Sequence, residues 1–179
     1  MTRSAARHYL LLLRHAKSDW DDPTLEDHER PLAARGRQAA PRMARHLTRT
    51  ALRPDLVLCS TARRARQTLD LVRPALPPVP IVHEDALYTF EASTLLERLR
   101  TCPPEARVVM VVGHNPALED LALHLSSGQQ EADRDHPVHR LRHKFPTAAL
   151  ATLGLSVGWS ELAGGTGWVD DFVRPKDLA

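Results

Sequence analysis

The chain has few cysteine, lysine and aromatic residues, and it has no long apolar run. Aromatic residues make up 4% of its 179 residues, and there are only two cysteines. Two cysteines provide neither a disulfide framework nor a cysteine-rich metal site. No stretch approaches the roughly 20 apolar residues that span a bilayer, and the apolar run Tyr9–Leu13 is too short for a signal peptide. We therefore expect a cytoplasmic protein with no membrane association.

The charge balance gives little support for a nucleic-acid partner. The formal net charge is +2, and only three of the 24 basic residues are lysines: Lys17, Lys144 and Lys176. The scarcity of aromatic residues removes the platforms on which bases would stack. A planar guanidinium suits phosphate, so the arginine bias fits phosphate binding, although genomic composition explains it equally well.

Strand and helix patterns alternate along the chain, and 42% of the residues are hydrophobic, enough for a sizeable core. The predicted strands are His8–Arg14, Asp55–Ser60, Ile81–Val82, Arg107–Gly113, Thr147–Leu153 and a further one at Trp159–Leu162. The predicted helices are Ala33–Thr50, Ala62–Val72, Ser93–Arg100 and Ala117–Leu125, and the polar stretch Ser126–Pro146 is predicted as a long loop. This order predicts one domain over residues 1–179, an α/β fold with three α/β/α layers and a largely parallel central sheet.

Two of the predicted strands end in a histidine. The run Leu11-Leu12-Leu13 leads into Arg14-His15, and Val111-Val112-Gly113 leads into His114-Asn115-Pro116. Ligands of open α/β sheets bind beyond the carboxyl ends of the strands, so both histidines are expected in one site. A neighbouring arginine lowers a histidine's pKa and keeps its imidazole neutral, as a nucleophile must be.

A third segment, Ser60–Thr68, follows another predicted strand and places arginines in the first turn of a helix. Ser60 can cap this helix. Cations are unfavourable at a helix N-terminus, so a bound anion is expected to compensate one of Arg63, Arg64 and Arg66. A solvated basic helix face is the alternative interpretation.

Together these segments resemble the histidine phosphatase superfamily, with its phosphoglycerate mutase-like fold, and in particular the SixA-type phosphohistidine phosphatases. The matching segments, in family order, are Arg14-His15-Ala16-Lys17-Ser18, Arg30-Pro31-Leu32 followed by Gly36, Ser60–Thr68, Gly113-His114-Asn115-Pro116 and Phe145-Pro146-Thr147. Each motif alone is common, but their combination is specific.

The resemblance implies a role for each matching residue. His15 would be the nucleophile and would form a phosphohistidine intermediate. Arg14 and Arg64 would bind the phosphoryl group, and His114 would complete the catalytic set. Three further residues would bind substrate near the mouth of the site: Ser18, Arg30 and Asn115.

The general acid of the mutase-type members has no clear counterpart. Glu84 and Asp85 fall in the corresponding region, but the surrounding glycine-rich pattern is absent. Cleavage of an alcohol ester benefits strongly from a proton donor, whereas phosphohistidine expels imidazole, a better leaving group. The sequence therefore favours phosphohistidine on a partner protein, with no cofactor and no metal. The oligomeric state stays open.

Four other functions remain as alternatives. A small-molecule phosphomonoesterase or a mutase of the same superfamily would act on a small phosphorylated substrate. A metal site would use His136, His139 and His143 with Asp133 or Asp135, although Pro137 and the neighbouring arginines argue for a solvated loop. A non-enzymatic basic binding module would rely on the arginine clusters at 63–66 and 140–144.

Overall fold

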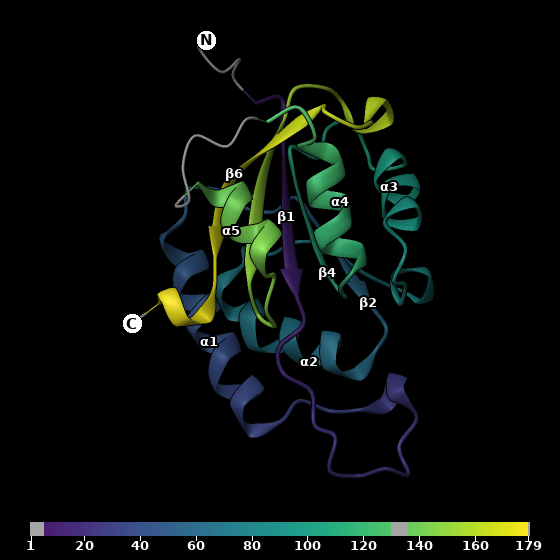
Figure 1. Ribbon diagram of the computed structural model, residues 1–179, viewed down its shortest axis with the longest axis vertical. Helices are drawn as coiled ribbons and strands as arrows, with labels where there is room; N and C mark the ends of the chain where they lie inside the picture. Colours follow the sequence, from purple (N-terminus) through teal and green to yellow (C-terminus); the bar gives the residue numbers. More distant parts are fainter. Residues whose placement is uncertain (1–5, 130–135, 179) are drawn as a thin grey trace.

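The computed structural model describes residues 6–129 and 136–178, which form a six-stranded sheet with helices on both faces (Figure 1). The strands are β1 (His8–Arg14), β2 (Leu56–Ser60), β3 (Ile81–Glu84), β4 (Val108–Gly113), β5 (Leu150–Leu155) and β6 (Gly167–Val173). Their order in the sheet is β3-β2-β4-β1-β5-β6. The first four strands pair in parallel, and β5 runs antiparallel to both β1 and β6.

The helices form the two outer layers. They are α1 (Ala34–Arg49), α2 (Arg63–Val72), α3 (Ala92–Arg100), α4 (Ala117–Leu125) and α5 (Pro137–His143). Helices α1 and α2 cover one face, while α3, α4 and α5 cover the other (Figure 1). Successive residues of a strand point to opposite faces, so β1 supplies both cores: Leu10 and Leu12 to one, Leu11 and Leu13 to the other. Burial on both faces explains its continuous apolar run.

The predicted α/β/α architecture is confirmed, and the sheet is mixed rather than purely parallel. The loop predicted over Ser126–Pro146 is wrong in part, because α5 lies inside it. Pro137 takes the first helical position, where its missing N–H costs nothing, so it begins this helix rather than preventing it.

The prediction for the C-terminal segment also needs correction. Trp159–Glu161 forms a single 3-10 turn, not a strand, and it buries Trp159. The last strand is β6, at the edge of the sheet. Within the two described ranges, no helix is long and apolar enough to cross a membrane.

Close backbone packing holds the segment that follows β1. Ser18 and Leu32 form an isolated bridge, and the N–H of Ala33 donates to the carbonyl of Lys17 at 2.9 Å. Gly36, in the first turn of α1, lies so close to Lys17 that a β-carbon would stand 2.2 Å from that carbonyl oxygen. The absence of a side chain at Gly36 therefore lets α1 pack against the chain leaving β1.

Candidate active site

His15 follows the last residue of β1 and is 8% exposed. Its Nδ1 lies 2.7 Å from the carbonyl oxygen of Ala16. A carbonyl oxygen only accepts hydrogen bonds, so this contact assigns the proton to Nδ1. The lone pair of the neutral ring is then on Nε2, and a nucleophile at this position would act through that atom.

The surroundings of His15 keep its ring neutral. Burial is the largest cause, and the charges of Arg64 and Arg14 add to it; together they lower the pKa of His15 to about 4. The hydrogen bond to Ala16 and the charge of Asp27 oppose this shift without reversing it. The imidazole therefore remains neutral at physiological pH.

Two arginines lie beside His15. Arg14 donates through Nη1 to the carbonyl of Phe145 at 2.6 Å, while its buried Nε has no hydrogen-bond partner among the described residues. Arg64, in the first turn of α2, is 5% exposed. It donates to the carbonyl of Asp27 at 2.6 Å and to the carboxylate of the same residue at 3.0 Å. A buried guanidinium N–H without an acceptor is suited to an oxyanion.

His114 follows β4, and its ring centroid lies 5.1 Å from that of His15. Its Nδ1 faces Arg64 at 3.5 Å, and its Nε2 lies 2.8 Å from Ser60 Oγ. Because the guanidinium can only donate, Nε2 carries the proton and donates it to Ser60. Burial first, then the closeness of the His15 ring and the charge of Arg64, lower the pKa of His114 to about 3.

Ser60 was expected to cap α2, but the structure gives that helix no side-chain cap. Ser60 Oγ accepts the N–H of Ala62, just before the helix, and the proton of His114. Its main contact therefore links the ends of β2 and β4.

One cavity of about 480 Å³ is lined by Arg14, His15, Arg64 and His114, and we call it the catalytic cavity. Ser18 and Asn115 also line it. Ser18 Oγ accepts the indole N–H of Trp20 at 3.1 Å. The amide of Asn115 donates to Glu119 at 2.9 Å and to the carbonyl of Phe145 at 3.2 Å.

The remaining expected residues lie outside the lining of the catalytic cavity. Arg30 stacks on Trp20, with its guanidinium 3.7 Å from the ring centroid. Glu84 is held by Arg98 at 2.7 Å, and Asp85 accepts from Thr61 at 2.6 Å. Both carboxylates thus have other partners, and the structure does not bring them to His15.

Asp27 lines the catalytic cavity and was missed in the sequence. Partial burial opposes its ionisation, yet hydrogen bonds from Tyr88 and Arg64 and the charge of Arg64 lower its pKa overall. Asp27 lies in a short 3-10 turn, Asp27–Glu29, with no motif around it. The only signal was its place between two matching segments.

Aromatic side chains form the rim of the catalytic cavity. Trp20 is 60% exposed and Phe90 is 49% exposed, and both line the cavity together with Tyr88. The rings of Tyr88 and Phe90 both contact His114, with centroids 5.3 and 6.2 Å away. Large exposed aromatic rings at a cavity mouth mark a surface for a partner or ligand.

Two of the residues proposed for a metal site, Asp133 and Asp135, lie outside the described residues. His136 accepts the N–H of Val138 and caps α5. Among residues 6–129 and 136–178, no three histidine, cysteine or acidic side chains are grouped as a metal ion would require.

Comparison with known sequences identifies a family. The model of the histidine phosphatase superfamily (branch 1) matches residues 10–93. An uncharacterized protein of Mycobacterium tuberculosis is 34% identical over 166 residues, which cover 92% of this chain and all of that protein. An uncharacterized protein of Mycobacterium leprae is 30% identical over 84% of this chain and 91% of its own length.

Comparison with solved structures agrees with this family. A protein from Agrobacterium tumefaciens that is named for the phosphohistidine phosphatase SixA is 30% identical, with a TM-score of 0.77, over 97% of this chain and 100% of its own. A SixA-named protein from Nakamurella multipartitia has a TM-score of 0.81 at 27% identity, over 94% of this chain and 96% of its own.

Proposed function

The chain belongs to the histidine phosphatase superfamily, and from this we propose that it removes the phosphoryl group from phosphohistidine on a partner protein through an intermediate on His15. One observation carries the choice of substrate. Among the described residues that line the catalytic cavity, the only carboxylate is Asp27, and its pKa is lowered rather than raised. A carboxylate that stays ionised is a poor proton donor for an alcohol leaving group.

The proposed reaction has two in-line displacements. In the first, Nε2 of neutral His15 forms a bond to phosphorus while the bond between phosphorus and the substrate ring breaks; that ring, protonated on its other nitrogen, leaves as neutral imidazole. In the second, water attacks phospho-His15, releasing inorganic phosphate and restoring the free ring. Each step needs positioning and stabilisation of the phosphoryl charge more than proton transfer.

In this proposal Arg14, Arg64 and His114 supply that stabilisation. The unpartnered Nε of Arg14 would donate to one phosphoryl oxygen. Arg64 would exchange its contact with Asp27 for a second oxygen. A bound phosphoryl dianion favours the charged form of His114, which could then donate through Nδ1.

The exposed rim supports a protein-borne substrate. A phosphohistidine side chain presents a flat ring behind its phosphoryl group, and Trp20 and Phe90 offer aromatic surface at the mouth of the cavity. Stacking between offset or edge-to-face aromatic rings contributes roughly 0.5–1.5 kcal/mol beyond their buried area.

The test compares hydrolysis of a phosphohistidine peptide with hydrolysis of glycerol 2-phosphate, an alkyl ester whose alcohol needs a proton to leave, in chelator, for the wild type and His15→Ala. We expect rapid loss of phosphohistidine, slow ester turnover, and at least a ~10³-fold loss of both in the variant. His83→Ala, an exposed histidine on β3, is the matched control. Fast ester turnover without phosphohistidine hydrolysis would move the protein to the small-molecule phosphatases.

A further inference from the structure

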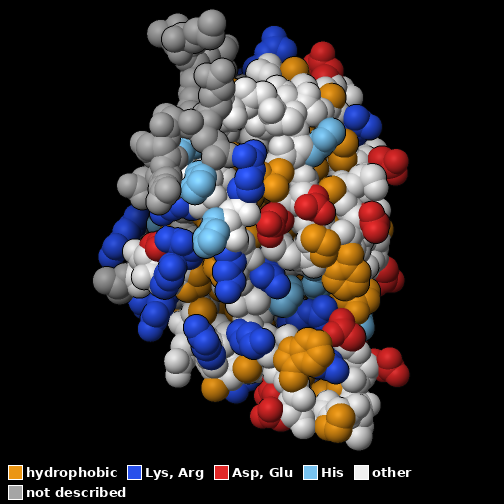
Figure 2. Space-filling view, in the orientation of Figure 1, with side chains coloured by type: hydrophobic (Ala, Val, Ile, Leu, Met, Phe, Trp, Pro, Cys, Tyr) orange, Lys and Arg blue, Asp and Glu red, His pale blue; other side chains and the backbone are white. Residues whose placement is uncertain are grey.

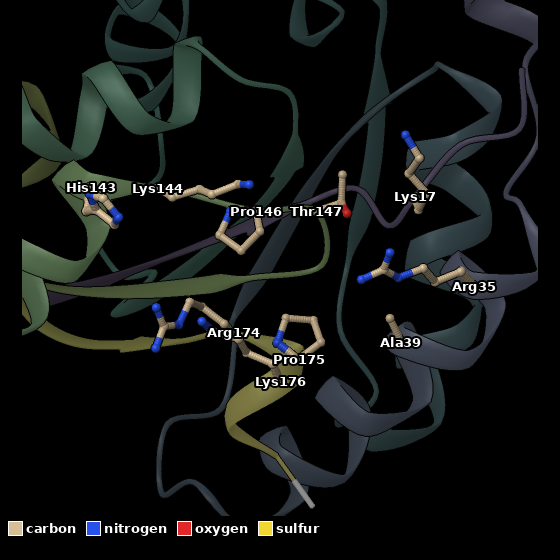
Figure 3. A pocket seen from close by; sticks show the side chains of 10 residues that line it. All are labelled: Lys17, Arg35, Ala39, His143, Lys144, Pro146, Thr147, Arg174, Pro175 and Lys176. Carbon is tan, nitrogen blue, oxygen red and sulfur yellow. The ribbon is translucent and has the colours of Figure 1, made fainter.

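A second cavity, of about 310 Å³, lies beside the catalytic cavity and shares Lys17 and Thr147 with it. We call it the basic cavity, because five of the residues that line it are lysine or arginine: Lys17, Arg35, Lys144, Arg174 and Lys176. Figure 3 shows Lys144 and Arg35 extending toward each other from opposite sides, with Pro175 and Lys176 below them.

All three lysines of the chain line this one cavity. They are remote in sequence: Lys17 follows β1, Lys144 follows α5, and Lys176 lies in the 3-10 turn Pro175–Asp177. Arginine supplies the other 21 of the 24 basic residues. The convergence of every lysine on one cavity is therefore a property of the fold that composition does not explain.

Among residues 6–129 and 136–178, few carboxylates compensate the charges of the basic cavity. Arg174 is an exception, because Asp177 binds it at 2.9 Å and also lies 3.8 Å from Arg140. Lys17, Arg35, Lys144 and Lys176 are exposed, and no carboxylate in the described ranges forms an ion pair with any of them. Figure 2 shows lysine and arginine side chains gathered over α5 and the C-terminal segment. Like charges brought together without partners attract an anion.

We propose that the basic cavity binds a second anionic group, a carboxylate or a phosphate, of the same molecule whose phosphoryl group occupies the catalytic cavity. Lys17 and Thr147 line both cavities, so a single substrate can span the two. Lysines are flexible point charges with three donors each, and they accept carboxylate and phosphate alike. This inference deepens the proposed function by adding a charge requirement to its substrate.

Two sources present this chemistry: an acidic side chain near the phosphorylated residue of a protein, and a second phosphate on a small molecule. The experiment uses a matched pair of substrates for each. One pair is a phosphohistidine peptide with glutamates beside the phosphohistidine and the same peptide with glutamines. The other pair is glucose 1,6-bisphosphate and glucose 6-phosphate.

The test variant is the double substitution Lys144→Gln and Lys176→Gln, which leaves the catalytic cavity untouched. Its matched control is Arg42→Gln with Arg45→Gln, two exposed residues on α1 that lose the same charge away from both cavities. We expect the kcat/KM of the wild type to be about fivefold higher for the more anionic member of one pair, because its KM is lower. The test variant should lose this preference, the control should keep it, and added salt should reduce it.

Amine labelling gives a readout that does not need turnover. In His15→Ala, the glutamate peptide or the bisphosphate should protect Lys144 and Lys176 from acetylation, and its less anionic counterpart should not. A preference for the glutamate peptide assigns the second anion to a protein, whereas one for the bisphosphate assigns it to a small molecule. Equal kcat/KM within both pairs, or no lysine protection, would overturn the proposal.

The proposed function would fail with a different result from the one that overturns the anion site. If neither phosphohistidine peptide is hydrolysed, the choice of reaction fails. The sugar phosphates and the lysine protection still decide whether the basic cavity holds an anion.

Discussion

Ser60 Oγ lies 2.8 Å from Nε2 of His114 and holds the ring of that histidine at the carboxyl end of the sheet. Both residues are almost fully buried, Ser60 at 0% and His114 at 1% exposure. The guanidinium of Arg64, which can only donate, faces Nδ1 of His114, so Nε2 carries the proton and donates it to Ser60. A hydroxyl that looked like a helix cap therefore positions a member of the proposed catalytic set.

Replacing Ser60 tests this role. Ser60→Ala leaves a buried N–H of His114 without an acceptor, which we expect to cost about 1–3 kcal/mol of unfolding free energy. It should also lower kcat several-fold, because the ring loses its fixed orientation. Ser126→Ala is the control, since Ser126 is also buried and donates to the carbonyl of Ala122, away from the cavity. Urea denaturation and steady-state kinetics measure both effects, and full activity in Ser60→Ala would exclude a positioning role.

Arg64 donates to the carboxylate of Asp27 at 3.0 Å, so we expect Asp27 to compete with a bound oxyanion for this guanidinium. In Asp27→Asn the negative charge leaves the cavity, so vanadate should inhibit at a concentration roughly threefold to tenfold lower. Glu26→Gln, an exposed neighbour, removes the same charge outside the cavity and should not change inhibition. Weaker vanadate binding in Asp27→Asn would show instead that Asp27 chiefly holds Arg64 in place.

His15 and His114 should make stability depend on pH. The pKa of His15 is lowered to about 4 and that of His114 to about 3, from an ordinary value of 6.5. Between pH 6.5 and pH 4 the unfolded chain binds protons that the folded chain does not, so the unfolding free energy falls as the pH falls. Each histidine contributes a slope of at most about 1.4 kcal/mol per pH unit.

Urea denaturation at pH 7 and pH 4.5 measures this slope. His114→Gln should make it shallower, and His83→Gln, which replaces an exposed histidine, should not. An unchanged slope in His114→Gln would mean that His114 is not held neutral by the fold.

Gly36 and Gly128 form a matched pair for packing. A β-carbon at Gly36 would stand 2.2 Å from the carbonyl oxygen of Lys17, whereas one at Gly128 meets nothing within 4 Å. Gly36→Ala should therefore destabilise the fold by about 1–3 kcal/mol and displace the segment that carries Ser18. Gly128→Ala should be neutral. Equal melting temperatures for the two variants would contradict the packing argument.

The sheet could be predicted from the sequence because strands that are buried on both faces consist of consecutive apolar residues. Leu10–Leu13 and Val108–Val112 are such runs, and both lead into the cavity. Strand β6 escaped prediction because it lies at the sheet edge, carries Asp170 and Asp171, and pairs with β5 across a bulge. Helix α5 escaped because it has only seven residues and begins with proline.

The sequence could indicate which residues of the candidate site lie together only where those residues follow strands. His15 and His114 extend β1 and β4, so their meeting follows from sheet topology. Asp27 and Phe90 come from connecting segments, and no periodicity indicates where such segments fold back. The convergence of the three lysines likewise depends on how α5 and the C-terminal turn pack, which a linear pattern does not encode.

The most direct test of the proposed reaction is to identify the phosphorylated atom of the enzyme. Rapid quenching of the wild type with labelled phosphohistidine peptide, followed by peptide mapping and phosphorus NMR, locates the label. Nδ1 of His15 donates to Ala16, so we expect acid-labile phosphate on Nε2 of His15 and none in His15→Ala. Phosphate on His114 or on Nδ1 of His15, or turnover without any labelled enzyme, would contradict it.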